Sequence, residues 1–228
     1  MGETQAEQFD FIIKIIIHLK CTRVESMVKF IKTYALEIFT VISMAMLLVG
    51  GLIGDLSVIQ KFTLVYIFLF VLHEWEEMKY PGGFADSIAK MLGVKMTDNM
   101  KRASRIPTSI LLLTFTITPF VLHEYPITIL PIAWLGLFEG FVHIFTIRLF
   151  KYPRFYSPGF VTAEIQAVFT IFVFTYFVRN DIVSCGEFLI GFMVMFVCFV
   201  IMQKSLTAMI GYKYSNVFKA IKKQFAKK

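Results

Sequence analysis

Charged residues are scarce in this sequence. Only 17% of its 228 residues are Asp, Glu, Lys or Arg, whereas 57% are hydrophobic. Soluble domains of this length carry more charge, and the mean hydropathy of +0.70 points the same way. The apolar residues lie in long runs, so the sequence predicts an integral membrane protein that crosses the bilayer several times.

Cysteine is equally scarce, with Cys21, Cys185 and Cys198 as the three examples and no CxxC spacing. Cys185 and Cys198 lie in or beside one apolar run, so we expect buried thiols or small core residues rather than disulfides or zinc ligands. A cleavable signal peptide is not expected either. Lys14 interrupts the first apolar patch, and no small-residue cleavage site follows.

The apolar runs predict an all-α fold, a polytopic bundle of about six transmembrane helices within residues 35–205. The six runs cover residues 35–54, 59–78, 106–122, 127–149, 160–178 and 182–203. Residues 1–34 mix isoleucines with basic residues, so we expect an amphipathic helix that lies in the lipid headgroup region. Residues 206–228 form a basic tail that suits anionic lipid headgroups.

Lysine and arginine gather on one side of the predicted spans. That side carries 21 of these residues, and the other side has only Lys61 and Arg179. Because basic loops stay in the cytoplasm, we expect both termini to be cytoplasmic. The topology accounts for the position of the net charge of +7, so nucleic acid is not expected as a partner.

The longest predicted connection covers residues 80–105. It begins with a Pro-Gly-Gly turn, and apolar residues then recur at helical spacing from Phe84 to Leu92. This pattern predicts a short amphipathic helix on the cytoplasmic surface. The helix serves either as a lid over a substrate entrance or as a simple connector.

Polar residues stand out at the end of the second apolar run. His73, Glu76 and Glu77 occupy positions i, i+3 and i+4, so they share one helical face. An imidazole and two carboxylates beside a membrane are costly to bury unless they bind something. The alternative is a solvated helix end that faces lysines.

Two further runs place polar residues at a similar depth. Glu139 and His143 lie at i and i+4 in the inner half of the fourth predicted span. Glu164 lies barely one turn inside the fifth span, which also starts from the cytoplasm. We therefore expect three helices to bring two histidines and four glutamates together.

Such a cluster favours a bound cation. Neighbouring carboxylates in a membrane repel one another unless a positive charge neutralises them. One interpretation is a single zinc ion held by His73, His143 and one glutamate, with another glutamate as base. The six side chains also match the ligand inventory of di-iron and di-manganese bundles, although in a different sequence order. A proton relay or a structural hydrogen-bonded network is the remaining alternative.

The motif His-Glu-Trp-Glu-Glu at 73–77 resembles the one that names the HXXEE-domain family, small integral membrane proteins of bacteria and archaea. Glu139, His143 and the Tyr-Ser-Pro-Gly turn at 156–159 look like further motifs of that family. The similarity covers roughly residues 55–205. The resemblance implies a prokaryotic cytoplasmic membrane and groups these residues, but it implies no particular chemistry.

The leading hypothesis from the sequence is a metal-dependent enzyme that acts on a membrane lipid or another lipophilic substrate. A bound Zn, Fe or Mn ion would activate water, with Glu76 or Glu77 as the general base. Tyr156, Arg148 and Arg154 are candidate substrate contacts. The alternatives are a di-iron or di-manganese oxidase or hydroxylase, and a metal, proton or small-molecule transporter. Transport ranks lower because the outer halves of the spans have few ionisable groups.

Overall fold

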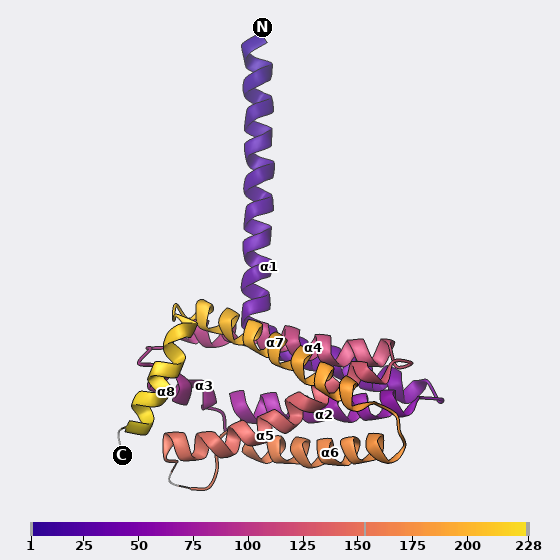
Figure 1. The fold of residues 1–228 in the computed structure, drawn as a ribbon. Helices are drawn as coiled ribbons and strands as arrows, with labels where there is room; N and C mark the ends of the chain where they lie inside the picture. The colour runs from indigo at the N-terminus through magenta and orange to yellow at the C-terminus, as the bar shows by residue number, and fades with distance from the viewer. Residues whose placement is uncertain (1, 153, 227–228) are drawn as a thin grey trace.

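The computed structural model describes residues 2–152 and 154–226, with the side chains of residues 2–17, 19 and 21 left out of the description. Within these residues the chain is helical and contains no strand (Figure 1). The helices are α1 (Gly2–Leu52), α2 (Val58–Met78), α3 (Phe84–Leu92), α4 (Asp98–Val121), α5 (Leu130–Phe150), α6 (Phe160–Arg179), α7 (Cys185–Met209) and α8 (Val217–Ala226). Short 3-10 turns, η1 (Pro126–Ile129) and η2 (Tyr214–Asn216), precede α5 and α8.

The predicted fold class is confirmed. Six helices are long and apolar enough to cross a membrane, and each covers most of one predicted run. Their apolar side chains face outward as well as inward, as Val168 and Phe172 on α6 illustrate. A helix that is apolar on all sides is expected in lipid. The side of the membrane on which the termini lie remains a prediction.

Helix α1 changes direction at Tyr34, whose φ of −115° and ψ of 21° depart from helical values. The part after Tyr34 packs on α2 and α4, whereas the part before it projects away from the bundle (Figure 1). In Figure 1 this projecting part rises across the direction of the bundle helices, and α3 and α8 do not lie along it. The headgroup location of residues 1–34 stays a prediction, and the side chains of residues 2–17 lie outside the description.

The connection between the second and third spans is more ordered than expected. The predicted short helix is confirmed as α3. Helix α4 begins at Asp98, before the predicted apolar run at 106–122, because the Thr97 hydroxyl accepts a hydrogen bond from the Met100 N–H and caps the helix. The polar first turns of α4 therefore extend beyond the apolar stretch.

The interior is built from aromatic and aliphatic side chains of α2, α4, α5 and α6. Tyr66, Phe70 and Phe177 are among the largest fully buried residues. The expectation of buried thiols is wrong for Cys185, which is exposed because it lies in the first turn of α7. Cys198 is half-buried.

Candidate metal centre

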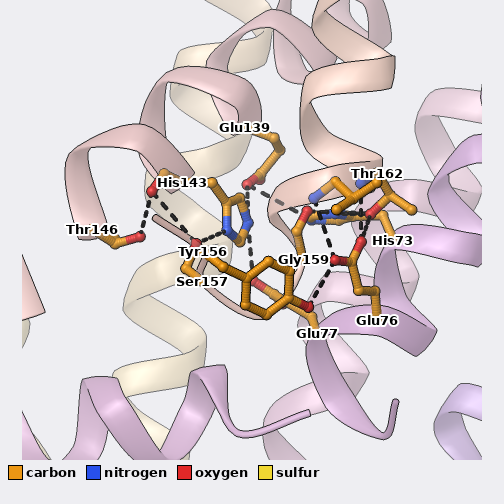
Figure 2. A network of polar contacts seen from close by, with 11 residues as sticks. His73, Glu76, Glu77, Glu139, His143, Thr146, Tyr156, Ser157, Gly159 and Thr162 are labelled. Atoms are coloured by element: carbon orange, nitrogen blue, oxygen red, sulfur yellow. Dashed lines mark hydrogen bonds and ion pairs between the residues drawn. The ribbon is translucent and has the colours of Figure 1, made fainter. Parts of the chain in front are cut away.

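Three of the predicted ligands come together between α2 and α5. His73, Glu139 and His143 each offer a ligand atom, and these atoms all lie within 4.8 Å of one another (Figure 2). The Nε2 atoms of His73 and His143 both lie 3.9 Å from the same carboxylate oxygen, Glu139 Oε2. Both histidines are buried in the protein interior. The group could therefore hold a cation at a place that water does not reach freely.

The hydrogen bonds of Thr162 define the proton position on His73. The Thr162 hydroxyl lies 2.6 Å from a Glu76 oxygen and 3.2 Å from the Gly159 carbonyl, both of which accept hydrogen bonds. Its single proton is thus committed, and the His73 Nδ1 atom 3.1 Å away must donate to the hydroxyl oxygen. A neutral imidazole with a proton on Nδ1 has its lone pair on Nε2. That lone pair faces Glu139.

Ser157 orients His143 in the same way. The Ser157 hydroxyl is directed at the His143 carbonyl at 3.4 Å and lies 3.0 Å from His143 Nδ1. When the hydroxyl donates to this carbonyl, Nδ1 donates to Ser157, and Nε2 again carries the lone pair. This Nε2 atom is buried and has no hydrogen-bond partner. An unpartnered buried nitrogen calls for an explanation such as an ion.

The arrangement fits a metal ion better than a set of hydrogen bonds. A distance of 3.9 Å is too long for a hydrogen bond between nitrogen and oxygen. Two ligand atoms that each lie about 2.1 Å from one ion are at most about 4.2 Å apart, and both Nε2–Oε2 distances are within this limit. Hydroxyl or carbonyl groups that hold the far nitrogen of each imidazole are usual around metal-binding histidines. Two neutral imidazoles and one carboxylate thus form a suitable donor set.

Glu77 lies beside this group. Its Oε1 atom is 3.5 Å from His143 Nε2, and its side chain is almost fully buried. The i and i+4 spacing of His73 and Glu77 places both on the face of α2 that meets α5, as the sequence predicted. Glu77 is therefore placed either to add a ligand atom or to accept a proton from a molecule bound at the centre.

Gly159 leaves the space that this arrangement needs. Its φ is +92°, a conformation that residues with a side chain rarely adopt. A Cβ atom there would lie 2.7 Å from the imidazole carbon Cε1 of His143 and 2.9 Å from Glu77 Cγ. The backbone before α6 therefore packs directly on two side chains of the site, and glycine is required at this position.

Glu76 is engaged by a different part of the structure. Its two oxygens accept hydrogen bonds from the Tyr156 hydroxyl at 2.9 Å, the Thr162 hydroxyl, and the backbone N–H groups of Val161 and Thr162 at 3.3 and 2.9 Å. Gly159, the residue before α6, has no side chain to cap the helix. Glu76 supplies that cap from α2. Its contacts tie α2 to α6 rather than direct it to the ligand group.

Tyr156 completes this cap. Burial, and then the hydrogen bond that its hydroxyl donates to Glu76, raise the pKa of Tyr156 above its usual value. The phenol therefore remains a donor through the neutral range. Arg148 and Arg154, the other predicted substrate contacts, are exposed. Their role in substrate binding stays a prediction.

Glu164 lies at the edge of the site rather than among the three ligands. It interacts electrostatically with His143, but it lines a neighbouring groove between α5, α6 and α7. Its Oε1 atom is buried without a hydrogen-bond partner. Of the six predicted ligands, the structure thus gathers His73, Glu139 and His143 most closely.

Helix α3 covers the opposite edge of the site. The ring of Phe84, the first residue of α3, lies 4.9 Å from the His143 ring. The Tyr152 hydroxyl donates a 2.5 Å hydrogen bond to Ser87, which ties α3 to the segment after α5. This position agrees with the lid interpretation, whereas opening of α3 remains a prediction.

The sequence assigned no role to several polar residues of the site. Thr162 and Ser157 act through hydroxyls whose partners lie on other helices, so spacing within one helix gives no signal. Glu74 is buried and interacts with Arg105, although it lies about 100° around the helix from His73 and the His73–Glu77 spacing does not include it. Gln166 is fully buried with both amide atoms unpartnered.

A second set of polar contacts joins α1 to α2 at the same end of the bundle. Glu37 on α1 and Lys79 form a 2.5 Å ion pair, and the Lys79 ammonium lies 4.6 Å above the ring of Trp75. The Trp75 indole N–H donates to Thr40 on α1 at 2.9 Å. The Glu37 side chain is half-buried. In the structure it has a partner that links α1 to the end of α2.

Comparison of the chain with protein-family models, with curated proteins and with solved structures finds no match. Membership of the HXXEE-domain family thus stays a prediction, and the function is inferred from the residues of the site.

Proposed function

We propose that this protein is a membrane-embedded, metal-dependent enzyme that hydrolyses a lipid or another lipophilic substrate. One observation carries the proposal. Two buried imidazoles are held by hydroxyls at Nδ1, so that both Nε2 lone pairs face one oxygen of Glu139. Membership of the HXXEE-domain family is part of the same proposal.

The donor set suits catalysis by a divalent ion. Two histidines and one glutamate are a usual set for catalytic zinc, and a fourth position stays open for water or substrate. An ion bound there would lower the pKa of a bound water toward about 7 and polarise a carbonyl or phosphoryl oxygen. The interior of a helix bundle also limits the access of bulk water.

Glu77 is the best-placed general base. Its Oε1 atom lies 3.5 Å from His143 Nε2. Unlike the carboxylate of Glu76, that of Glu77 does not cap a helix. Glu76 shared this role in the sequence-based hypothesis, but its oxygens already accept hydrogen bonds from α6 and Tyr156. We therefore assign proton transfer to Glu77 and positioning of α6 to Glu76.

The positions of the other carboxylates favour a centre with one ion. A pair of ions needs the bridging carboxylates of a six-ligand set. Glu76 is engaged as a cap, and Glu164 lines the neighbouring groove. The di-iron and di-manganese alternative therefore ranks below a single ion.

A second candidate function is oxidation by a single iron. The same two-histidine, one-carboxylate set binds Fe(II) in oxygenases, so the donor atoms on their own support both reactions. Transport remains the third alternative. The buried residues beyond the site include Gln166 and Thr170, which are polar but carry no charge.

The experiment that separates these functions measures the masses of the lipid products. Purified protein loaded with Zn, Fe or Mn is incubated with vesicles of a bacterial polar lipid extract, and the lipids are profiled by mass spectrometry. Hydrolysis gives two fragments whose masses sum to the substrate plus water, whereas oxygenation adds oxygen to one species. We expect hydrolysis, abolished in Glu77→Gln and retained in Glu124→Gln, a matched change at the other end of the bundle.

Two results would contradict the proposal. Oxygenated products without fragments would transfer the assignment to the iron oxygenase. Full hydrolysis in Glu77→Gln would remove Glu77 from the reaction.

A further inference from the structure

A groove of about 470 Å³ runs beside the metal centre, between α5, α6 and α7. Ten residues line it, and Glu164 is the one charged residue among them. On α5 the lining extends from Trp134 to Ile144, a rise of ten residues or about 15 Å of helix at 1.5 Å per residue. The space is therefore elongated along the helices and almost entirely apolar.

The groove faces lipid on one side. Phe141 in its lining is 66% exposed, and Ile144 is also exposed. These positions lie within a helix that is long and apolar enough to cross the membrane. A molecule dissolved in the bilayer can therefore enter sideways, without passing through water.

Gly140 brings the groove next to the metal centre. A Cβ atom at this residue would lie 2.8 Å from Ala167 Cβ and 3.7 Å from Glu164 Oε1. Helices α5 and α6 are thus in close contact here, and Glu164 lies beside the turn of α5 that carries Glu139 and His143. The charged end of the groove adjoins the proposed reaction site.

Glu164 has an unmet hydrogen-bonding capacity at that end. Its Oε1 atom is buried and has no partner. A buried acceptor without a donor is costly, so a ligand that supplies a donor is favoured. A ligand with its own negative charge is disfavoured by the carboxylate.

We propose that this groove binds one long hydrocarbon chain whose polar end donates a hydrogen bond to Glu164. The ligand class is a single-chain alcohol or amine, or the corresponding part of a larger lipid. At ~30 Å³ per heavy atom, the share of a water molecule in the liquid, 470 Å³ holds about 15 heavy atoms. The inference rests on the proposed function: a free alcohol or amine has no bond that water cleaves, so it corresponds to the product, and the substrate is the larger lipid that contains this chain.

The two tryptophans of the chain make a direct test possible. Trp134 lines the groove, and Trp75 is the other tryptophan. In a Trp75→Phe background, the fluorescence of Trp134 reports a brominated ligand by quenching. The probes are saturated long-chain primary alcohols in nanodiscs of unbrominated lipid, brominated either near the hydroxyl or near the far end.

With its hydroxyl at Glu164, the bound alcohol extends toward Trp134. We expect saturable quenching, stronger for bromine at the far end than for bromine near the hydroxyl. The carboxylic acid of the same length should bind at least about tenfold more weakly, because its charge meets that of Glu164. In Glu164→Gln this difference should disappear.

Two variants on α6 provide the steric test. Ala167→Phe fills the groove at a residue that is 9% exposed, whereas Val168→Phe adds the same ring at a neighbour that is 67% exposed to lipid. We expect Ala167→Phe to abolish saturable quenching and Val168→Phe to retain it, with circular dichroism as the check on folding. Glu164→Gln keeps the test valid if Ala167→Phe misfolds.

The proposal is overturned if quenching rises linearly with the mole fraction of bromine, or if alcohol and acid bind equally to the unaltered groove. The titration is repeated after chelation, with metal measured separately by elemental analysis. Quenching without any metal binding would leave the groove in place and reject the proposed enzyme. Metal binding without saturable quenching would reject the groove alone.

Discussion

Substituting Thr162 with valine tests how the ligands are oriented. Valine keeps the shape of threonine but removes the hydroxyl that accepts from His73 Nδ1 and donates to Glu76. The backbone N–H groups of Val161 and Thr162 still bind Glu76, so the cap of α6 is retained in part. The main consequence falls on His73, which loses the group that fixes its proton on Nδ1.

The magnitude follows from the two lost hydrogen bonds. A hydrogen bond to a charged group contributes about 1.5–3 kcal/mol, and a buried donor left without a partner costs about 1–3 kcal/mol. The second of these acts on the imidazole that binds the ion. Loss of such a supporting group usually weakens metal binding about 10- to 100-fold, which corresponds to about 1.4–2.7 kcal/mol. We therefore expect the zinc Kd of Thr162→Val to rise about 10- to 100-fold.

The assay is a competition titration of the purified protein against a fluorescent zinc chelator. Thr116→Val is the matched control, because Thr116 is a buried threonine of α4 whose hydroxyl binds carbonyls of its own helix. The control should bind zinc as the unaltered protein does. Equal affinities for Thr162→Val and Thr116→Val would refute the assignment of His73 as a ligand held by Thr162.

Three further predictions concern the turn before α6. Gly159→Ala should lower the stability by about 2–6 kcal/mol, from backbone strain and overpacking, and should displace His143; thermal unfolding and metal content both report it. Glu76→Gln should cost about 1–2 kcal/mol in thermal unfolding through the weakened cap of α6, with the metal content unchanged; loss of the metal would instead make Glu76 a ligand. The pKa of Tyr156 is raised above its ordinary value of 10.0, so the folded state holds this proton longer and the resulting stabilisation is present below pH 10 and lost at higher pH. A difference titration of tyrosinate absorbance between the protein and Tyr156→Phe should show the missing phenol ionising above pH 10.

Much of the fold could be predicted from the sequence because the membrane limits the choices. A run of about 20 apolar residues has few alternatives to a spanning helix. The short helix from Phe84 to Leu92 was recognisable by its spacing and by the Pro-Gly-Gly turn before it. The bend at Tyr34 lies where the mixed segment 1–34 gives way to the first apolar run, although neither proline nor glycine marks it.

The site could be predicted in part, for a related reason. Spacing within one helix places His73 and Glu77 on one face of α2, and Glu139 and His143 on one face of α5. It does not say what each atom meets on the next helix. Glu76 shares the face of His73, yet the N–H groups at the start of α6 bind it because Gly159 offers no cap.

Glu74 shows the opposite limitation. Its position about 100° from His73 indicated a different environment. In a bundle that surrounds α2, however, this direction is also interior, and Glu74 is buried near Arg105 of α4. Helical periodicity separates faces within a helix, but which faces are covered depends on the packing of all the helices.

The most direct test of the account is the metal content of the purified protein. Inductively coupled plasma mass spectrometry is applied to protein prepared in mild detergent without chelator, with His143→Ala and His123→Ala beside it. His123 lies between α4 and η1, away from the ligand group, so it serves as the matched control. We predict near-stoichiometric zinc, iron or manganese in the unaltered protein and in His123→Ala, and its loss in His143→Ala. Absence of metal from all three, even after reconstitution, would contradict the account and favour a hydrogen-bonded carboxylate network.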